Sequence, residues 1–265
     1  MAEETPTVVD GVPSKCLSLT LSGEWGHFRR IDRTVSKQTY RIPPRTTLAG
    51  LLAGIVGVGR DGYYDLFQPS NSALAIELVD PVRTVPMPSL GLGTNPSETF
   101  DSAGGTGRKT VAARFPDSTD ARQLHSYHYL VNPTYRLHVA IEDPAFYGTL
   151  RDRLTSGTSY YPPTLGLSEL NAAVEYHGEH SVTADASDEP VSVTSVLPDG
   201  GASIIPSPGS SYSIERVPGY MSADESGRTT TGYIDYAFTE DATPMTINDD
   251  ELALGTVNDR LVAFT

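Results

Sequence analysis

Apolar and polar residues alternate in several short runs along the chain, and this pattern predicts β-strands. In the first run Leu17, Leu19 and Leu21 alternate with serine and threonine, which is typical of a half-buried strand. Comparable runs predict further strands over residues 73–79, 135–141 and 172–176.

Two residues inside these runs differ from their neighbours. Cys16 begins the first run and is expected to be a small buried residue of the core. His138 lies at the opposite parity to Leu137 and Val139, so we expect it on the solvent side of its strand.

Longer apolar periodicities predict two helices. The pair Pro43-Pro44 favours a helix start, and Gly57 is expected to cap the end of that helix. Asp143 and Pro144 open a second helix, which continues through Leu154. The apolar residues of the first helix fall on one face, and they are Leu48, Leu51, Leu52, Ile55 and Val56.

The order of these elements is strand, helix, strand, then strand, helix, strand, with residues 86–125 inserted between the two halves. This order predicts an α+β fold of the split βαβ, ferredoxin-like kind over residues 15–180. Residues 1–14 are expected to form a flexible leader, and residues 181–265 an acidic, β-rich C-terminal extension. The strand candidates of that extension are Ser203–Ile205, Ser211–Val217, Gly232–Phe238 and Arg260–Phe264.

The insertion at residues 86–125 is rich in glycine and proline and has few apolar anchors. A segment of this length and composition in a compact domain is usually functional or disordered. Its sequence Gly104-Gly105-Thr106-Gly107-Arg108-Lys109-Thr110 resembles a phosphate-binding loop, but an arginine separates the last glycine from the lysine and no apolar strand precedes it. We therefore expect a flexible basic loop tip there.

Composition narrows the class of protein. The 265 residues include 24 glycines and 20 prolines, which favours many turns over a helical bundle. A single cysteine excludes an internal disulfide framework and a multi-cysteine zinc site. No run approaches the roughly 18 apolar residues of a membrane span, and the N-terminus is acidic, so we expect a soluble, cytoplasmic protein without a membrane partner.

Charge is distributed unevenly along the chain. The formal net charge is −14, yet residues 1–160 carry 16 cations and 16 acids, whereas residues 161–265 carry 3 cations and 17 acids. Only 3 of the cations are lysines. A dispersed acid excess with little lysine is typical of a protein that works in molar salt, and we favour this halophilic interpretation over an acidic surface that mimics nucleic acid or binds a basic partner.

Positive charge is nevertheless concentrated in residues 25–45, which we call the basic segment. It holds six cations against a single acid, Asp32. Its cations are Arg29, Arg30, Arg33, Lys37, Arg41 and Arg45, and the aromatic and imidazole side chains interleaved with them are Trp25, His27, Phe28 and Tyr40. This combination stacks unpaired bases and binds phosphates, so we predict an RNA ligand. The alternative is a solvated loop whose arginines pair with acids elsewhere in the fold.

Salt bears on how such a segment would bind RNA. Affinity for single strands falls with salt at a slope of roughly −0.7 per phosphate neutralised, so purely ionic binding would weaken in molar salt. Arginine forks and base stacking must then supply much of the affinity, which fits the excess of arginine over lysine.

No metal, cofactor or small-molecule substrate is expected, because the histidines lack carboxylate or cysteine neighbours at metal-ligand spacing. A metal-free ribonuclease site is an alternative to simple binding. In such a site Tyr40, Lys109 and either His125 or His128 would take the 2′-hydroxyl proton and stabilise the phosphorane. Nothing in the sequence shows that these residues converge.

Three motifs together resemble a known family. They are Gly23-Glu24-Trp25-Gly26-His27-Phe28-Arg29, the segment 40–57 with its Pro43-Pro44-Arg45-Thr46-Thr47 helix entry, and Tyr161-Pro162-Pro163-Thr164-Leu165-Gly166. Over about residues 15–180 the chain is similar to the fifth CRISPR-associated protein family, Cas-five, in its type I-B form, and its composition suggests a haloarchaeal member. The residues after 180 match only loosely.

The resemblance implies a ferredoxin-like, RRM-related domain of the RAMP class with a C-terminal β extension. It implies a subunit of the Cascade surveillance complex in antiviral defence, which caps the 5′ handle of the crRNA. The implied protein partners are the first backbone subunit, the large subunit and the processing endonuclease. Residues 86–125 would be a thumb across the RNA, with Arg108, Lys109 and Arg114 as its cations. The turn around Pro163 and Gly166 would be a glycine-bearing loop near the RNA, although it has fewer glycines than is usual in the family.

One branch of the family, in type I-C systems, cuts the precursor RNA with a tyrosine, a lysine and a histidine. Here Lys109 is followed by Thr110 instead of histidine, so that pattern is not met. In type I-B systems a separate endonuclease does the cutting. We therefore predict a non-catalytic RNA-binding subunit, with a metal-independent endoribonuclease that processes pre-crRNA as the alternative.

Overall fold

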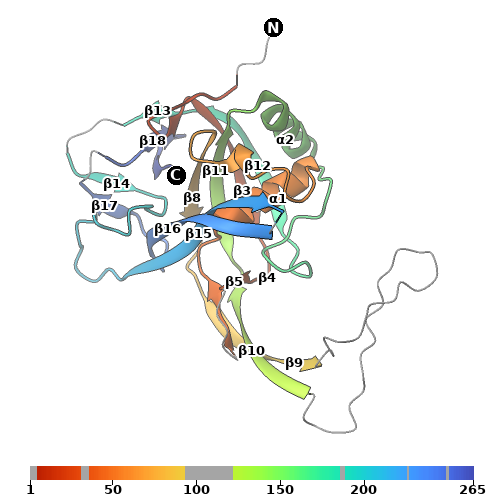
Figure 1. The fold of residues 1–265 in the computed structure, drawn as a ribbon. Helices are drawn as coiled ribbons and strands as arrows, with labels where there is room; N and C mark the ends of the chain where they lie inside the picture. The colour runs from red at the N-terminus through yellow and green to blue at the C-terminus, as the bar shows by residue number, and fades with distance from the viewer. Residues whose placement is uncertain (1–4, 31–35, 93–121, 186–188, 226, 249–250) are drawn as a thin grey trace.

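The computed structural model describes residues 5–30, 36–92, 122–185, 189–225, 227–248 and 251–265. At its centre is a four-stranded antiparallel sheet in the order β12-β3-β11-β8 (Figure 1). Its strands are β3 (Lys15–Ser22), β8 (Ser72–Leu78), β11 (Thr134–Ile141) and β12 (Ala173–Ser181). The helices are α1 (Arg45–Val56), which follows β3, and α2 (Pro144–Ser156), which follows β11. The predicted order of strand, helix, strand, strand, helix, strand is confirmed.

Local sequence defines the ends of both helices. Gly57 ends α1 with a left-handed φ of 97°, and its N–H donates to the carbonyl of Ala53 at 2.8 Å. Asp143 caps α2, because its carboxylate accepts a hydrogen bond from the N–H of Phe146 at 2.7 Å. The two predicted caps are therefore confirmed.

The main core lies between the helices and one face of the sheet. The leucines of β3 that alternate in the sequence, Leu17, Leu19 and Leu21, are all at most 1% exposed. They share one cluster with Leu52 of α1 and Leu150 of α2. The alternation thus identifies the face that packs against the helices.

C-terminal strands cover much of the opposite face of the sheet. Cys16 and Ala75 point to this side and pack against Val262 and Phe264. Cys16 is fully buried, as predicted, and burial raises the pKa of its thiol to about 12. Because both faces are covered, β3 is buried along almost its whole length, and the prediction of a half-buried strand is wrong.

The same covering buries His138, which is only 2% exposed. Its parity was read correctly, since it lies on the face away from the helices, but its predicted surface position is wrong. Its Nε2–H donates to Oε1 of Glu77 at 2.9 Å, and its Nδ1 lies 2.7 Å from the hydroxyl of Ser18. Glu77 also accepts from Nε of Arg260 at 2.7 Å. We call Ser18, His138, Glu77 and Arg260 the buried polar network; it joins β3, β11 and β8 to the last strand of the chain.

The C-terminal part consists almost wholly of strands and turns. Its strands are β13 (Thr183–Ala184), β14 (Val191–Val193), β15 (Tyr212–Asp224), β16 (Gly227–Thr239), β17 (Met245–Ile247), β18 (Leu254–Val257) and β19 (Arg260–Ala263). Three of the four predicted strands correspond to β15, β16 and β19. The fourth, at 203–205, is wrong, because Ile204 makes only an isolated bridge to Ile247.

The hairpin of β15 and β16 lies across α1 (Figure 1). Val217 and Ile234 of this hairpin belong to the same buried cluster as the leucines of β3. The C-terminal part therefore shares the main core and also forms a smaller cluster of its own around Val193 and Leu197.

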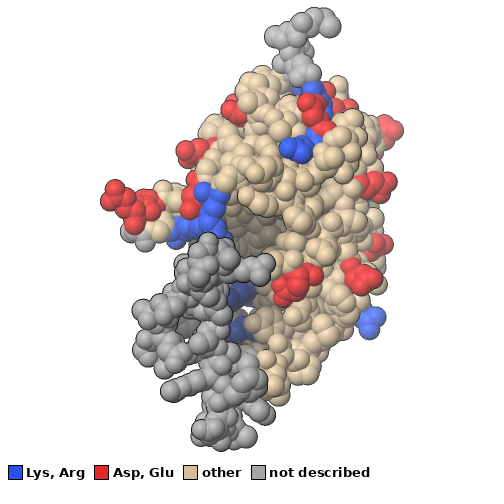
Figure 2. Space-filling view, turned by 90° about the vertical axis from the view of Figure 1, so that its right-hand side faces the viewer, with Lys and Arg blue, Asp and Glu red and all other residues tan. Residues whose placement is uncertain are grey.

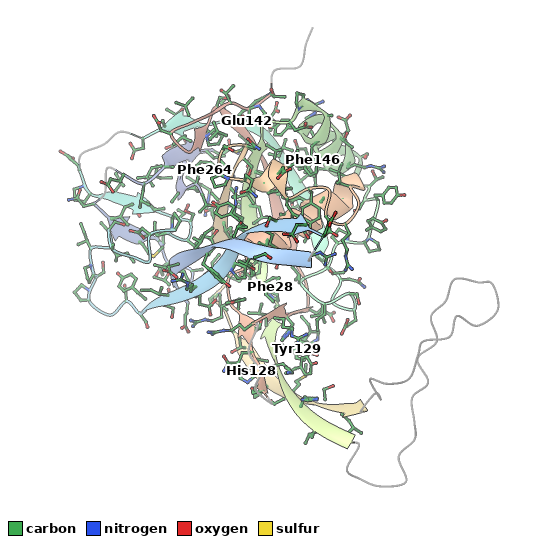
Figure 3. The ribbon with its side chains drawn as sticks, in the orientation of Figure 1. Phe28, His128, Tyr129, Glu142, Phe146 and Phe264 are labelled. Atoms are coloured by element: carbon green, nitrogen blue, oxygen red, sulfur yellow. The ribbon has the colours of Figure 1, made fainter. Side chains whose placement is uncertain are left out.

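A short hairpin precedes the central sheet, formed by β1 (Val8–Val9) and β2 (Val12–Pro13). The N–H of Val8 donates to Oε1 of Glu142 at 2.9 Å, and Val8 packs against the cluster around Cys16. Figure 3 labels Glu142 at this upper end of the molecule. For these residues the prediction of a flexible leader is wrong.

A second, smaller sheet projects from the body (Figure 1). Its longest strand, β10 (Arg122–Val131), pairs with β9 (Thr84–Leu92), β4 (Trp25–Gly26) and β6 (Ser36–Lys37). Beside it β5 (Phe28–Arg29) pairs with β7 (Thr39–Tyr40). Elsewhere in the chain, η1 (Asp65–Phe67) is a 3₁₀ turn between α1 and β8. The base of the predicted insertion is thus an antiparallel ribbon of β9 and β10, which the prolines of β9 hid from the sequence pattern. None of the described helices is long and apolar enough to span a membrane.

Candidate nucleic-acid interface

The described part of the basic segment folds into four short strands at the junction between the body and the projecting sheet. β4 and β6 pair with two different stretches of β10, on the edge opposite β9, and β5 pairs with β7. Figure 3 shows Phe28 at this junction. Strand pairing therefore fixes the backbone of a segment in which the sequence showed no clear periodicity.

Among the described residues of this segment, Arg29 and Arg30 are the exposed cations. No carboxylate among the described residues lies within ion-pair distance of either side chain. The guanidinium of Arg30 lies 5.4 Å from the ring centroid of Tyr40, a cation–π contact that orients it. In the view of Figure 2, several Lys and Arg side chains gather beside a hollow, and acidic side chains are scattered over the rest of this face.

Four residues predicted to contact RNA are instead interior residues. The aromatic and imidazole members are His27, Phe28 and Tyr40, whose exposed fractions are 0%, 2% and 8%. A base can stack only on an exposed ring face, so these three predictions are wrong as direct contacts. Phe28 and Tyr40 are cross-strand partners in β5 and β7, and both belong to the main core.

Arg45 is the fourth, and it is fully buried at the start of α1. Its Nη1 donates to the backbone oxygen of Thr265 at 2.8 Å, and its Nη2 donates to the hydroxyl and the carbonyl of Ser72 at 2.8 and 3.2 Å. Its guanidinium also lies 5.2 Å from the ring centroid of Tyr220. Burial lowers the pKa of Arg45, but an arginine stays charged in a protein. The prediction that Arg45 binds RNA is therefore wrong: it binds the chain's own oxygens.

Arg41 fits the alternative interpretation of the basic segment, in which its arginines pair with acids elsewhere in the fold. Its Nε donates to Oε1 of Glu215 at 2.8 Å, and its Nη1 pairs with Glu240. The backbone N–H of Arg41 also donates to Glu215 at 2.7 Å, and its carbonyl accepts from the hydroxyl of Tyr135 at 2.6 Å. Arg41 thus attaches the basic segment to β15 and β11.

Aromatic rings line the face of β10 that meets β4. The rings of Tyr127 and Tyr129 are 6.1 Å apart, with an angle of 27° between their planes. Trp25 meets Tyr129 edge-on at 6.2 Å, and His27 lies 5.4 and 5.6 Å from Tyr127 and Tyr129. Sequence reasoning missed both tyrosines, because it treated residues 86–125 as an insertion and predicted no strand between residues 126 and 134. The signal was present as the alternation of Tyr127 and Tyr129 with His128 and Leu130.

His27 is held in one orientation and one charge state. Burial lowers its pKa, and this outweighs the hydrogen bond to the carbonyl of His128, which would raise it. At pH 7 the ring is therefore neutral, and its Nδ1–H donates to that carbonyl at 2.8 Å. His27 is a rigid support beside the two tyrosine rings.

A groove of about 380 Å³ runs between α1 and the turn at residues 161–166. Its lining is uncharged and includes Thr46, Gly50, Tyr63, Tyr161 and Pro163. Gly50 and Gly54 lie one helical turn apart on α1, and the lack of side chains there leaves room for the groove.

Gly166 docks this turn against the basic segment. Its φ is 99°, and a Cβ at this position would lie 2.0 Å from the carbonyl oxygen of His27. The N–H of His27 donates to the carbonyl of Leu165 at 2.9 Å. The two predicted turn residues, Pro163 and Gly166, are thus brought to Phe28 and to the start of α1.

Replacing Gly166 with alanine is expected to lower the free energy of unfolding by about 2 to 3 kcal/mol, because the left-handed φ is strained and the turn must move away from His27. Urea unfolding measures this. Gly209→Ala is the matched control, since Gly209 has a φ of 85° but an added Cβ would meet nothing within 4 Å. Equal losses in the two variants would show that the close approach to His27 is unimportant.

Tyr40, His125 and His128 are the described candidates for a ribonuclease site. Tyr40 is buried, while His125 and His128 lie on opposite faces of β10 because they are three residues apart in a strand. Figure 3 shows His128 and Tyr129 on opposite sides of this strand. His128 lies 3.1 Å from the hydroxyl of Ser36. Of the remaining predicted site residues Arg33, Arg108, Lys109 and Arg114 lie outside the described residues, and Lys37 is half-buried on β6.

Across the described residues no group of three His, Cys, Asp or Glu side chains is arranged to hold a metal ion. The surface formed by Arg29 and Arg30, the tyrosines of β10 and the groove beside α1 is cationic, aromatic and hydroxyl-bearing. Such a surface can bind phosphates and stack bases.

One comparison with known proteins identifies a family, and another shows a fold shared with solved CRISPR proteins. The family model described as CRISPR-associated protein (Cas_Cas5) matches residues 16–230. The chain is also similar to a solved chain of a "CRISPR RNA-guided surveillance complex", with 17% identity over 87% of this chain and 91% of that one and a TM-score of 0.56. A CRISPR protein from Archaeoglobus fulgidus is similar with 14% identity over 94% and 98% and a TM-score of 0.54. Identities this low show a common fold alone. No curated protein matches the chain.

Proposed function

Because this chain belongs to the CRISPR-associated Cas5 family, we propose that it is a crRNA-binding subunit of a CRISPR RNA-guided surveillance complex. Within that role we assign it to a type I-B Cascade of a halophile, where it holds the 5′ handle of the crRNA in antiviral defence. The backbone subunit, the large subunit and the processing endonuclease are its proposed protein partners.

One observation carries the proposal. Three segments far apart in the sequence, 25–30, the start of α1 and 161–166, meet at one surface around His27. Arg29 and Arg30 follow directly on the residues that contact the Gly166 turn, and both are exposed. Cations next to a groove lined by hydroxyls and tyrosines suit a single-stranded RNA better than a protein partner.

The fold supports the same assignment. The sheet order β12-β3-β11-β8 with two helices on one face supports a ferredoxin-like, RRM-related domain of the RAMP class over residues 15–180. Residues 181–265 would be its C-terminal extension, and the β9–β10 ribbon would be the base of its thumb. The face opposite the helices, on which RRM domains stack RNA, is partly covered here by C-terminal residues, so RNA must bind elsewhere.

We propose a binding role without catalysis. Tyr40, which would be the tyrosine of a ribonuclease site, is 8% exposed and packs in the core beside Phe28. A phenol in that position cannot reach a 2′-hydroxyl without unpacking β5 and β7.

The Arg29→Ala, Arg30→Ala double variant is expected to bind 5′-handle RNA more weakly and with a smaller salt dependence. Each arginine that neutralises one phosphate contributes roughly 0.7 to the slope of log affinity against log salt, so the slope should fall by about 1.4. Filter binding from low to molar salt measures this. Arg41 is left unchanged, because its pairs with Glu215 and Glu240 are structural.

Arg216→Ala is the matched control, because this arginine is 69% exposed on β15 and lies 3.9 Å from Asp235. It removes one positive charge away from the basic segment and should leave the slope unchanged. An unaltered slope in the double variant would contradict the assignment of RNA to this surface.

The alternative of a metal-independent endoribonuclease has its own test. Repeat RNA is incubated with the purified chain in chelator, and we expect it to remain intact. A single cut that is lost in Lys109→Ala would overturn the non-catalytic assignment.

A further inference from the structure

We propose that Tyr127 and Tyr129 form a platform on which unpaired RNA bases stack. This inference rests on the RNA-binding function proposed above, and it adds the bases themselves to what the site recognises. The two tyrosines are absent from the basic segment and lie about a hundred residues after it in the sequence.

The geometry of the two rings carries the proposal. Tyr127 and Tyr129 are alternate residues of β10, so both side chains stand on the same face of the ribbon. Their ring planes differ by only 27° and their centroids are 6.1 Å apart, so the rings stand side by side and nearly parallel. Both residues are half-buried and thus keep part of their surface open.

The residues around the rings hold them in place. The imidazole of His27 is fully buried and lies within 5.6 Å of both ring centroids, with its orientation fixed by the carbonyl of His128. Trp25 supports the edge of Tyr129. On β9 the cross-strand partners are Met87 for Tyr127 and Val85 for Tyr129, which extend the same face with apolar side chains. A prearranged pair of rings loses little conformational entropy when a base binds.

The position of the platform suits a surface that binds RNA better than a part of the hydrophobic core. β4 carries Trp25 to this face and the chain continues through His27 to the exposed Arg29 and Arg30. A strand whose phosphates contact these arginines can therefore turn its bases toward β10. Stacking on the rings adds affinity that does not fall with salt, whereas the affinity of a purely ionic contact does.

Leucine replacements test the platform, because Tyr127→Leu and Tyr129→Leu keep apolar bulk but remove the flat ring. Binding of an oligouridine is compared with that of an equally long oligomer of abasic ribose phosphates. For the wild-type chain we expect tighter binding of the oligouridine. Each leucine variant should weaken oligouridine binding by roughly tenfold and the double variant by roughly a hundredfold, without changing the slope against salt. Abasic binding should stay as in wild type.

Two further measurements control for folding and position. Tyr127→Phe and Tyr129→Phe keep the rings and should bind as wild type does. Trp25 is the single tryptophan of the chain and lies 6.2 Å from Tyr129, so its fluorescence should change when oligouridine binds and not when the abasic oligomer binds.

The outcomes separate this inference from the function on which it rests. If the wild-type chain binds oligouridine and the leucine variants bind it equally well, the platform is wrong and the proposed function stands. A leucine variant that weakens both oligomers alike would also overturn the platform, since phosphate contacts would then be affected. If the wild-type chain binds neither oligomer, both proposals fail.

Discussion

Replacing Glu77 with glutamine is expected to lower the free energy of unfolding by about 3 to 5 kcal/mol at pH 7, the range found when one partner of a buried ion pair is removed. Glu77 is 0% exposed, and the buried polar network depends on its charge. Its carboxylate accepts from His138 at 2.9 Å and from Nε and Nη2 of Arg260 at 2.7 and 2.6 Å. A glutamine fills the same space, but it offers one acceptor oxygen to donors that approach from two sides.

The loss should depend on pH in a defined direction. Burial alone would raise the pKa of Glu77, but the hydrogen bonds from His138 and Arg260 outweigh it and lower the pKa to about 2. The unfolded chain, with an ordinary pKa near 4.5, binds the proton first as the pH falls. The stabilisation is therefore complete above about pH 5 and is lost between about pH 5 and pH 2, an effect of about 3 kcal/mol.

Urea unfolding of the wild type and Glu77→Gln at pH 7 and pH 3 measures both effects. The difference between the two proteins should be large at pH 7 and smaller at pH 3. Asp152→Asn is the control, because Asp152 is 74% exposed and its pair with Arg151 should contribute less than about 1 kcal/mol. A difference between wild type and Glu77→Gln that is independent of pH would contradict an ionised Glu77 in the network.

The network also shows what sequence patterns could and could not predict about the fold. The alternation of Leu17, Leu19 and Leu21 correctly identified the face of β3 that packs against the helices. The polar residues that alternate with these leucines, such as Ser18, and the parity of His138 indicated that the sheet has a second face, but they did not indicate what covers it. That cover comes from residues more than a hundred positions later, such as Val262 and Phe264. A local period carries no information about such a distant contact.

The candidate site shows the same limit in its chemistry. A count of cations identified the basic segment, and Arg29 and Arg30 are indeed exposed. The count could not distinguish them from Arg41, which pairs with Glu215 and Glu240, or from Arg45, which is fully buried. Tyr127 and Tyr129 join the site only because strand pairing sets β10 beside β4, a pairing that spans about a hundred residues.

Replacing Arg45 with methionine is expected to destabilise the fold by about 3 to 5 kcal/mol and to leave RNA binding by the folded fraction unchanged. Among the described residues at the start of α1, only the side chain of Arg45 donates to both Thr265 and Ser72, at 2.8 Å each. Methionine has a similar length but no N–H group. It leaves the oxygens of Thr265, Ser72 and Phe67 without these donors, and each unsatisfied buried acceptor costs about 1 to 3 kcal/mol.

Thermal unfolding and filter binding of the same samples test this prediction together. Arg45→Lys keeps the charge but replaces the planar guanidinium with a single ammonium group. The two ends of the guanidinium donate to Thr265 and to Ser72, and an ammonium group cannot donate to both in this way. The stability of this variant should therefore lie between those of the wild type and the methionine variant. If Arg45 bound phosphate, the methionine variant would melt as the wild type does and bind RNA with a slope smaller by about 0.7. That result would return Arg45 to the RNA surface. The opposite result, a large loss of stability with an unchanged slope, would mean that the arginine of the helix entry serves the fold, because it joins α1 to β8 and to Thr265.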